Sequence, residues 1–230
     1  MAKTVTDRTA AAVETSGGGG FLRDNVRLLG FIGIGLLALV GVIAFFMYSR
    51  GQNNEKALIE LGRIRPYYDR GEYAIAINGD SSKMYGTERV RGLQQIVADY
   101  ESEPAGKLAA LLLGNSYLGI GEPAKAQAPF ETAAGADDGL VTAAAHAGLA
   151  SVAEAANRFE DAAREFERAA SEDQLEVNTP QYLINAARNY ERAGKKQEAI
   201  EQYKTVATRF AQSQANAQAR LALARHGVEL

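Results

Sequence analysis

The segment LLLGNSYLGIGEPAKAQAPFETAA, residues 111–134, contains a pattern that recurs twice further along the chain. Its phenylalanine, Phe130, is followed by Phe166 and Tyr203 at intervals of 36 and 37 residues. An alanine lies four residues before each of these rings. A nearly constant interval of this length indicates stacked copies of one supersecondary unit.

Small residues mark the positions where the helices of such a unit would meet. They are Ala126, Ala162 and Ala199 just before the rings, and Gly114, Ala150 and Ala187 further upstream. Small side chains let two helices approach closely, and a ring buried between them removes a large apolar area from water. The pattern resembles the tetratricopeptide repeat, a pair of antiparallel helices of about 34 residues. The resemblance implies an α-solenoid that binds other proteins.

Three regular helix pairs are predicted in the second half of the chain. Their expected bounds are 104–118 with 124–134, 141–156 with 160–170, and 180–193 with 196–210. Thr179 is expected to cap the third pair, because threonine followed by proline is typical of a helix start. A polar helix over residues 213–225 is expected to close the stack. These elements make up a repeat region over residues 102–230.

Residues 49–101 fit the same pattern in degenerate form. An amphipathic helix is expected over residues 55–70, and Leu93 lies 37 residues before Phe130. The polar composition near residues 78–86 predicts an inserted loop of about a dozen residues, after which Thr87 would start a helix. The predicted fold class is therefore all-α, with about four helix pairs, the first degenerate, and a capping helix.

Residues 28–48 form an apolar stretch without any charged side chain. As a helix it would be about 31 Å long, which matches the hydrocarbon core of a bilayer. The stretch is too long for the apolar part of a signal peptide, and residues 45–48 offer no small-residue cleavage site. We expect a single transmembrane helix here, after a flexible tail over residues 1–27 that contains a glycine-rich linker.

The charges around this stretch do not decide its orientation. Arg23 and Arg27 precede it and basic side chains also follow it, so neither side has the excess that marks the cytoplasm. Small residues on one helical face would let another transmembrane helix pack closely, although glycine is frequent in such helices in general. They are Gly30, Gly33, Gly41 and Ala44.

No motif for catalysis, metal binding or cofactor binding is present in the sequence. It contains no cysteine, and its two histidines, His146 and His226, have no ligand partner at a helical spacing. The formal net charge is −3, whereas a protein that binds nucleic acid is expected to present a basic face. We therefore expect protein partners, with no enzyme activity, cofactor, nucleic acid or small-molecule substrate.

Partner binding is expected on the concave side of the stack, which the first helix of each pair lines. The positions that follow from the helical period are Leu108, Leu111, Asn115, Leu118, Ala144, Ala147, Ser151, Glu154, Gln181, Ile184, Arg188 and Arg192. This groove would be apolar at one end and cationic at the other, which suits a segment with an apolar part and an acidic group. The alternative for Leu108 and Leu111 is packing against the degenerate first repeat.

The whole layout resembles the bacterial ancillary subunit of the Sec translocon. The resemblance rests on the order of tail, transmembrane helix and repeats, and on the stretches Gly71–Tyr73, Leu113–Leu118 and Gly194–Ala199. It implies a protein of the bacterial inner membrane with a periplasmic repeat domain, whose partners are translocon subunits, a periplasmic chaperone or exported chains. Two alternatives stay open: a scaffold for another envelope complex, such as cytochrome maturation or respiratory assembly, and an adaptor that faces the cytoplasm.

Overall fold

The computed structural model describes the backbone of residues 26–229 and the side chains of residues 39–44, 47–49 and 51–229. The chain divides into two compact units, residues 1–49 and 50–230. Helix α2 (Val26–Asp69) contributes residues to both units. Most of the predicted tail, residues 1–25, lies outside the described residues.

The described side chains of the first unit belong to an apolar part of α2. Leu39, Val40, Val42 and Ile43 are each about half exposed. Of the predicted packing residues, Gly41 and Ala44 are also exposed, whereas the side-chain positions of Gly30 and Gly33 lie outside the described part. No helix in the described part of the chain is long and apolar enough to cross a membrane. The transmembrane helix over residues 28–48 thus stays a prediction.

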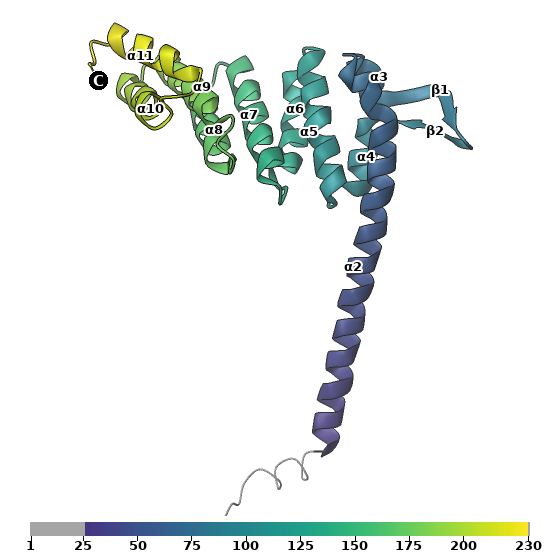
Figure 1. The fold of residues 1–230 in the computed structure, drawn as a ribbon. Coiled ribbons are helices and arrows are strands. Elements are labelled where there is room, and N and C mark those ends of the chain that lie inside the picture. The colour runs from purple at the N-terminus through teal and green to yellow at the C-terminus, as the bar shows by residue number, and fades with distance from the viewer. Residues whose placement is uncertain (1–25, 230) are drawn as a thin grey trace, which may run out of the picture. The chain divides into compact units, whose positions relative to one another are not determined.

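The second unit is a stack of helix pairs (Figure 1). Residues 50–69 of α2 form the first helix of the first pair. The next three pairs are α5 (Pro104–Gly119) with α6 (Pro123–Ala134), α7 (Gly139–Ala155) with α8 (Phe159–Glu172), and α9 (Thr179–Arg192) with α10 (Lys196–Arg209). Helix α11 (Ala215–Arg225) packs on α9 and α10 and ends the stack. The helices predicted after residue 104 are confirmed to within two residues at each end.

Each helix pair turns at a residue with a positive φ angle. The turn residues are Gly71, Gly121, Asn157 and Gly194. Glycine adopts this conformation without a steric penalty, and asparagine tolerates it better than most residues. The last three follow one another at 36 and 37 residues, whereas Gly71 precedes Gly121 by 50 residues. The difference reflects an insertion within the first pair.

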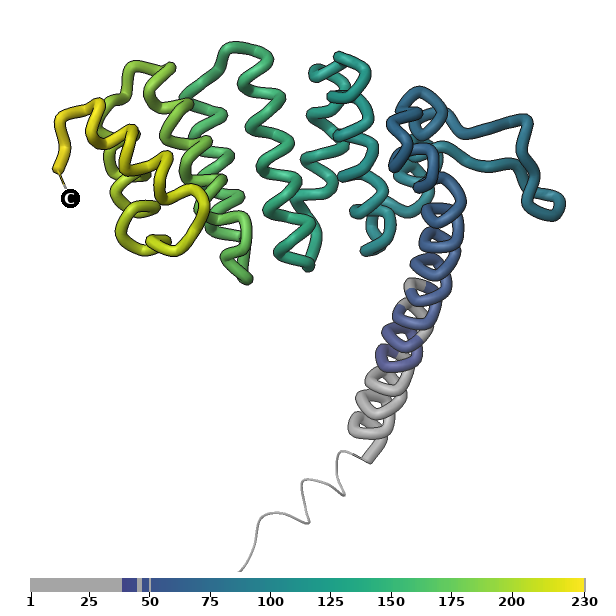
Figure 2. Tube along the Cα trace, turned by 45° about the horizontal axis from the view of Figure 1, so that its top comes forward, coloured from purple at the N-terminus to yellow at the C-terminus, as the bar shows by residue number. Residues whose placement is uncertain are grey.

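The insertion is a β-hairpin, which corrects both the purely α-helical prediction and the predicted loop. Strand β1 (Gly79–Tyr85) pairs antiparallel with β2 (Glu88–Arg91), between the short helices α3 (Tyr73–Asn78) and α4 (Leu93–Tyr100). Thr87 lies in the turn of the hairpin instead of capping a helix. Figure 2 shows the hairpin projecting away from the neighbouring helices.

Contacts between backbone atoms explain the residues at the base of this hairpin. A Cβ atom at Gly79 would lie 2.5 Å from the carbonyl oxygen of Val90, and one at Gly92 would lie 2.3 Å from that of Ile77. Atoms do not approach so closely, so both positions require glycine. The hairpin is further tied to α2, because Tyr67 donates to Asp80 at 2.6 Å and Arg63 pairs with Glu88 at 2.8 Å.

Two main apolar cores lie along the stack. The N-terminal core, residues 61–152, contains Leu61 and Ile64 of α2, the leucines 111–113 of α5, and Phe130. The C-terminal core, residues 163–223, is centred on Ile184 and Tyr203. A smaller cluster between them contains Phe166 together with alanines that include Ala150, Ala162 and Ala186. The rings and small residues of the repeat pattern are thus interior residues.

The start of α9 differs from its prediction in one respect. The prediction that Thr179 caps the helix is wrong, because Thr179 is the first residue of α9 and its side chain accepts from no amide of the helix. Instead, buried Asp173 in the preceding loop accepts hydrogen bonds from the backbone amides of Asn178 and Thr179 at 2.6 and 2.7 Å. The same carboxylate oxygen accepts the hydroxyl of Thr179 at 3.1 Å. The first amides of a helix lack partners within the helix, and Asp173 supplies the acceptor.

Candidate functional site

The first helices of successive pairs follow one another along the second unit. They are residues 50–69 of α2, then α5, α7, α9 and finally α11, and we call their exposed surface the first-helix face. Helix α5 contacts α7, and α9 contacts α11, so these helices lie next to one another. Two cavities open on this face, one near each end of the second unit.

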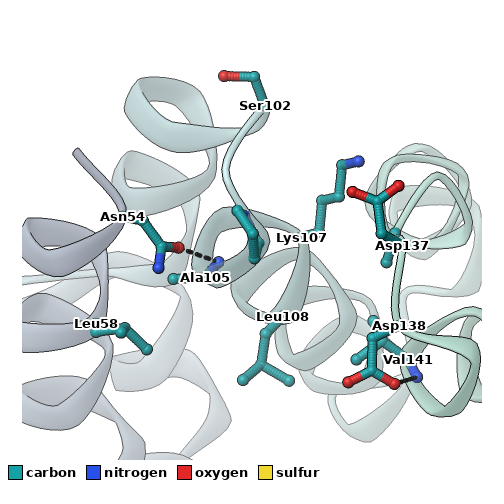
Figure 3. A pocket seen from close by; sticks show the side chains of 11 residues that line it. Asn54, Leu58, Ser102, Ala105, Lys107, Leu108, Asp137, Asp138 and Val141 are labelled. Atoms are coloured by element: carbon teal, nitrogen blue, oxygen red, sulfur yellow. Dashed lines mark hydrogen bonds between the residues drawn. The ribbon is translucent and has the colours of Figure 1, made fainter. Parts of the chain in front are cut away.

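The cavity near the N-terminal end is an apolar cleft of about 470 Å³ where α2, α5 and α7 meet (Figure 3). Leu58, Leu108 and Val141 line it, one from each helix. The rim is polar and contains Asn54, Ser102, Lys107, Asp137 and Asp138. Leu58 is 51% exposed, so an apolar surface here remains in contact with water. We call this cavity the apolar cleft.

Helix-start hydrogen bonds hold two sides of the apolar cleft in place. The side-chain oxygen of Asn54 accepts from the amide of Ala105 at 2.9 Å and so links α2 to the first turn of α5. Asp138 caps α7 by accepting from the amide of Leu140 at 2.8 Å. Both bonds satisfy amides that have no partner within their own helix. The cleft is therefore pre-formed.

The rim of the apolar cleft carries more negative than positive charge. Lys107 donates to the carbonyl of Gly135. The carboxylate of Asp137 forms no hydrogen bond or ion pair with any other residue in the described part of the chain. This arrangement favours a ligand that places an apolar side chain in the cleft and a basic group beside it.

The predicted groove residues of the first half divide between surface and core. Leu108 lines the apolar cleft and also packs against the N-terminal core, and Asn115 donates to the hydroxyl of Tyr68 at 3.3 Å. Leu118 is half-buried against the N-terminal core. Leu111 is only 8% exposed and belongs to that core, which corrects its assignment to the groove. Its side chain packs in the same core as the first helix pair, as in the alternative interpretation.

The predicted residues on α7 are also partly enclosed. Ala144 packs against the N-terminal core and Ala147 against the cluster around Phe166. The hydroxyl of Ser151 donates to its own helix, at the carbonyl of Ala147, at 3.1 Å. Glu154 is more accessible and accepts from the amide nitrogen of Asn189 at 2.7 Å. Helix α7 thus contributes a mostly small and neutral surface.

The predicted residues on α9 form the cationic part of the face, with one exception. Ile184 is fully buried in the C-terminal core, which corrects its assignment to an exposed groove position, although the residue also lines the second cavity. Gln181 is exposed and donates to Asn185 at 3.0 Å. The guanidinium carbon of Arg192 lies 3.8 Å from the centre of the Phe159 ring. Its nitrogen Nη1 lies 3.9 Å from a carboxylate oxygen of Glu154. Arg188 lines the second cavity.

The second cavity has a volume of about 190 Å³ and lies between α9 and α11. Arg188 and Glu191 enter it from α9, Tyr203 from α10, and Gln218, Leu221 and Arg225 from α11. The α11 residues were not predicted, because that helix was interpreted as a polar cap. Their spacing of three, four and seven residues on one helical face is the signal that could have identified them.

Both histidines form contacts that bridge helices. His146 Nδ1 lies 2.8 Å from a carboxylate oxygen of Glu165 on α8, and His226 Nε2 lies 2.5 Å from Glu191 on α9. These partners are 19 and 35 residues away in sequence, so a search at helical spacings could not find them. Among the described residues, no group of three or more potential ligands could hold a metal ion.

Comparison with known proteins identifies the repeat type. Residues 111–176, from the middle of α5 to the loop after α8, match the tetratricopeptide repeat family. This part of the chain is similar to tetratricopeptide repeats. Repeats of this type generally mediate protein–protein interactions and are typically not enzymes. No curated protein and no solved structure matches the chain.

Proposed function

We propose that the protein is a membrane-anchored scaffold of the bacterial inner membrane that binds other proteins through its apolar cleft, as an accessory of the Sec translocon. The apolar cleft carries this proposal. Leu58, Leu108 and Val141 converge on one pre-formed space from three different helices. Burying a leucine side chain completely is worth about 1.5–3 kcal/mol, so a partner that fills the cleft gains binding energy.

The anchor is supported by the apolar surface of α2 in the first unit. Residues 28–48 carry no charge, and the six described positions from Leu39 to Ala44 are all exposed. A helix that is apolar on all sides needs an apolar environment around it, such as a bilayer. The predicted small-residue face, Gly41 with Ala44, would then be available to another transmembrane helix.

The proposed partners follow from the resemblance to the translocon subunit and from the chemistry of the cleft. Emerging exported chains and the loops of membrane proteins present apolar segments, and the acidic rim with Asp137 would favour a basic residue beside them. We place the repeat unit in the periplasm, where a membrane-anchored chaperone would also be within reach.

Co-purification with the full chain tests this function. The chain, tagged at its C-terminus, is extracted from bacterial membranes in mild detergent, and the accompanying proteins are identified. We expect translocon subunits together with a periplasmic folding factor. The Leu58→Asp variant should no longer co-purify with these proteins, because the substitution places a charge in the cleft. Leu175→Asp is the matched control, since Leu175 is 75% exposed in the loop before α9, outside the cleft.

The other outcomes separate the parts of the proposal. Recovery of a different envelope complex would show that the export role is wrong while the scaffold role stands. Equal recovery with Leu58→Asp would show that the cleft is not the binding site. A phosphatase fused after Leu230 tests the location, because it is active only outside the cytoplasm. An inactive fusion, at normal expression, would contradict the periplasmic orientation.

A further inference from the structure

The cavity between α9 and α11 has a different character from the apolar cleft. Two arginines on different helices, Arg188 on α9 and Arg225 on α11, line it together with Gln218 and Leu221. We call this cavity the arginine pocket. It lies after residue 176, so it is outside the segment that matches the repeat family.

The charges of these two arginines are not neutralised within the described chain. No carboxylate of the described residues pairs with Arg188 or Arg225, and Arg188 donates only to the neutral amide oxygen of Gln218, at 3.1 Å. Most other arginines of the second unit behave differently, for example Arg164, which pairs with both Glu160 and Asp161. The pocket therefore keeps guanidinium groups available to a ligand.

The one acidic residue that lines the arginine pocket is already engaged. One carboxylate oxygen of Glu191 accepts the hydroxyl of Tyr203 at 3.1 Å, and the other lies 2.5 Å from His226 Nε2. Glu191 is thus directed toward Tyr203 and His226. It reduces the positive potential of the pocket, but two arginines outnumber it.

Tyr203 lines the arginine pocket together with the two arginines. Burial and the neighbouring Glu191 raise the pKa of Tyr203 to about 12, and the positive charges of Arg188 and Arg225 both oppose this rise. Leu221, which is 56% exposed, provides an apolar surface beside them.

We propose that the arginine pocket binds a carboxylate group of a protein partner, with Arg188 and Arg225 as the donors and Leu221 in contact with the adjoining aliphatic carbons. A guanidinium group offers planar, paired N–H donors that match the two oxygens of a carboxylate. The carboxylate comes either from an acidic side chain or from a chain terminus. This site is separate from the apolar cleft and does not depend on the proposed role in export.

Peptide binding to the full chain in detergent tests this inference. Four versions of the fluorescent peptide Ala-Ala-Leu-Ala-Leu-Glu are compared by anisotropy, with Glu or Gln as the last residue and with a free or an amidated C-terminus. Binding that requires the free terminus identifies a terminal carboxylate as the ligand, and binding of the amidated Glu peptide identifies a side-chain carboxylate. If the amidated Gln peptide, which has no carboxylate, binds as well as the others, or if no peptide binds, the inference is wrong.

Variants then assign the binding to the pocket. Arg188→Gln and Arg225→Gln should each weaken binding by about tenfold or more, because each removes a charge-assisted hydrogen bond. Arg220→Gln is the matched control, since Arg220 is on the same helix but bonds to Asn216. Leu175→Asp, which lies outside both cavities, should leave peptide binding unchanged. If Arg220→Gln weakens peptide binding as much as the two pocket variants do, the binding depends on positive charge in general. This result would contradict the inference.

Discussion

The N-terminal and C-terminal halves of the second unit share one repeat pattern and each has an apolar core, but different residues join their helices. In the N-terminal half, three consecutive leucines of α5, residues 111–113, are buried in the core. In the C-terminal half, polar side chains bridge neighbouring helices, as when Glu167 accepts from both Tyr190 and Gln202. The spacing of rings and small residues is therefore sufficient to set the helix pairing, while the other residues decide which surface is left for partners.

The aromatic rings of the first two regular repeats, Phe130 and Phe166, also differ in their surroundings. Phe130 is fully buried between Gly114 and Gly148, whereas Phe166, which is 5% exposed, lies in a cluster of alanines. Because glycine has no side chain, the Phe130 ring approaches two helix backbones directly. The contact around Phe130 is thus closer, and the two glycines beside the ring have no side chain that could fill a space.

The largest effect is expected from removing these rings. Phe130→Ala should lower the free energy of unfolding by about 5 kcal/mol and Phe166→Ala by about 3 kcal/mol, the two ends of the usual range for such changes. The order follows because the glycines beside Phe130 cannot refill the cavity. Urea unfolding of the full chain in detergent, followed by helical circular dichroism, measures both. An equal or reversed order would show that the contrast between the two rings has no energetic consequence.

A smaller effect is expected from adding a single methyl group. Gly148→Ala should destabilise the protein by about 1–3 kcal/mol, since the new Cβ atom would lie 2.4 Å from the Phe130 ring. At a helix position without this contact, the same change would stabilise the protein by up to about 1 kcal/mol. The same unfolding experiment gives the sign. In a Phe130→Leu variant, Gly148→Ala should lower the free energy of unfolding by less than it does in the native chain. An equal loss in both backgrounds would show that the clash with the Phe130 ring is not the cause.

Much of the helical stack could be predicted because the repeat presents the same information three times. Rings and small residues recur at 36–37 residues, so an ambiguous helix boundary in one copy is fixed by the others. The misplaced side chains, Leu111 and Ile184, are apolar residues on first helices that face both a neighbouring helix and the groove. The sequence period predicts where each helix lies in the repeat. It does not predict the exact rotation of the helix about its axis, which decides whether such a side chain is buried in the core or exposed in the groove.

The hairpin and the arginine pocket depend on contacts that occur only once in the chain. Residues 80–89 show no alternation of apolar and polar side chains, and their strands are held by α2 through Tyr67 and Arg63. The arginine pocket needs α11 to lie beside α9, so that Arg225 reaches the cavity lined by Arg188. Single long-range contacts of this kind leave no repeated signal in the sequence.

The smallest effect concerns the hairpin, which is found in the first helix pair alone among the described repeats. Hydrogen bonds from the side chain of Ser82 and the hydroxyl of Tyr67, followed by that from the Ser82 amide, lower the pKa of Asp80 from 3.8 to about 2. A lowered pKa in the folded state means that Asp80 stabilises the hairpin fully above about pH 4, and that this contribution is lost as the pH falls toward 2. The stability difference between the native chain and Asp80→Asn should therefore be constant from pH 7 to about 4 and shrink below it.

The carboxyl signal of Asp80, followed by nuclear magnetic resonance, gives its titration midpoint directly. Ser82→Ala should raise this midpoint more than Tyr67→Phe, because the hydrogen bond from the Ser82 hydroxyl lowers the pKa of Asp80 most and that from the Tyr67 hydroxyl comes second. The backbone amide of residue 82 remains a donor in the alanine variant. Lys83 is a useful control, since its ammonium group lies over the rings of Tyr67 and Tyr85 and not on the carboxylate. If Lys83→Gln shifts the midpoint as far as Ser82→Ala, then the local positive charge, and not the hydrogen bonds from Ser82 and Tyr67, determines the acidity of Asp80.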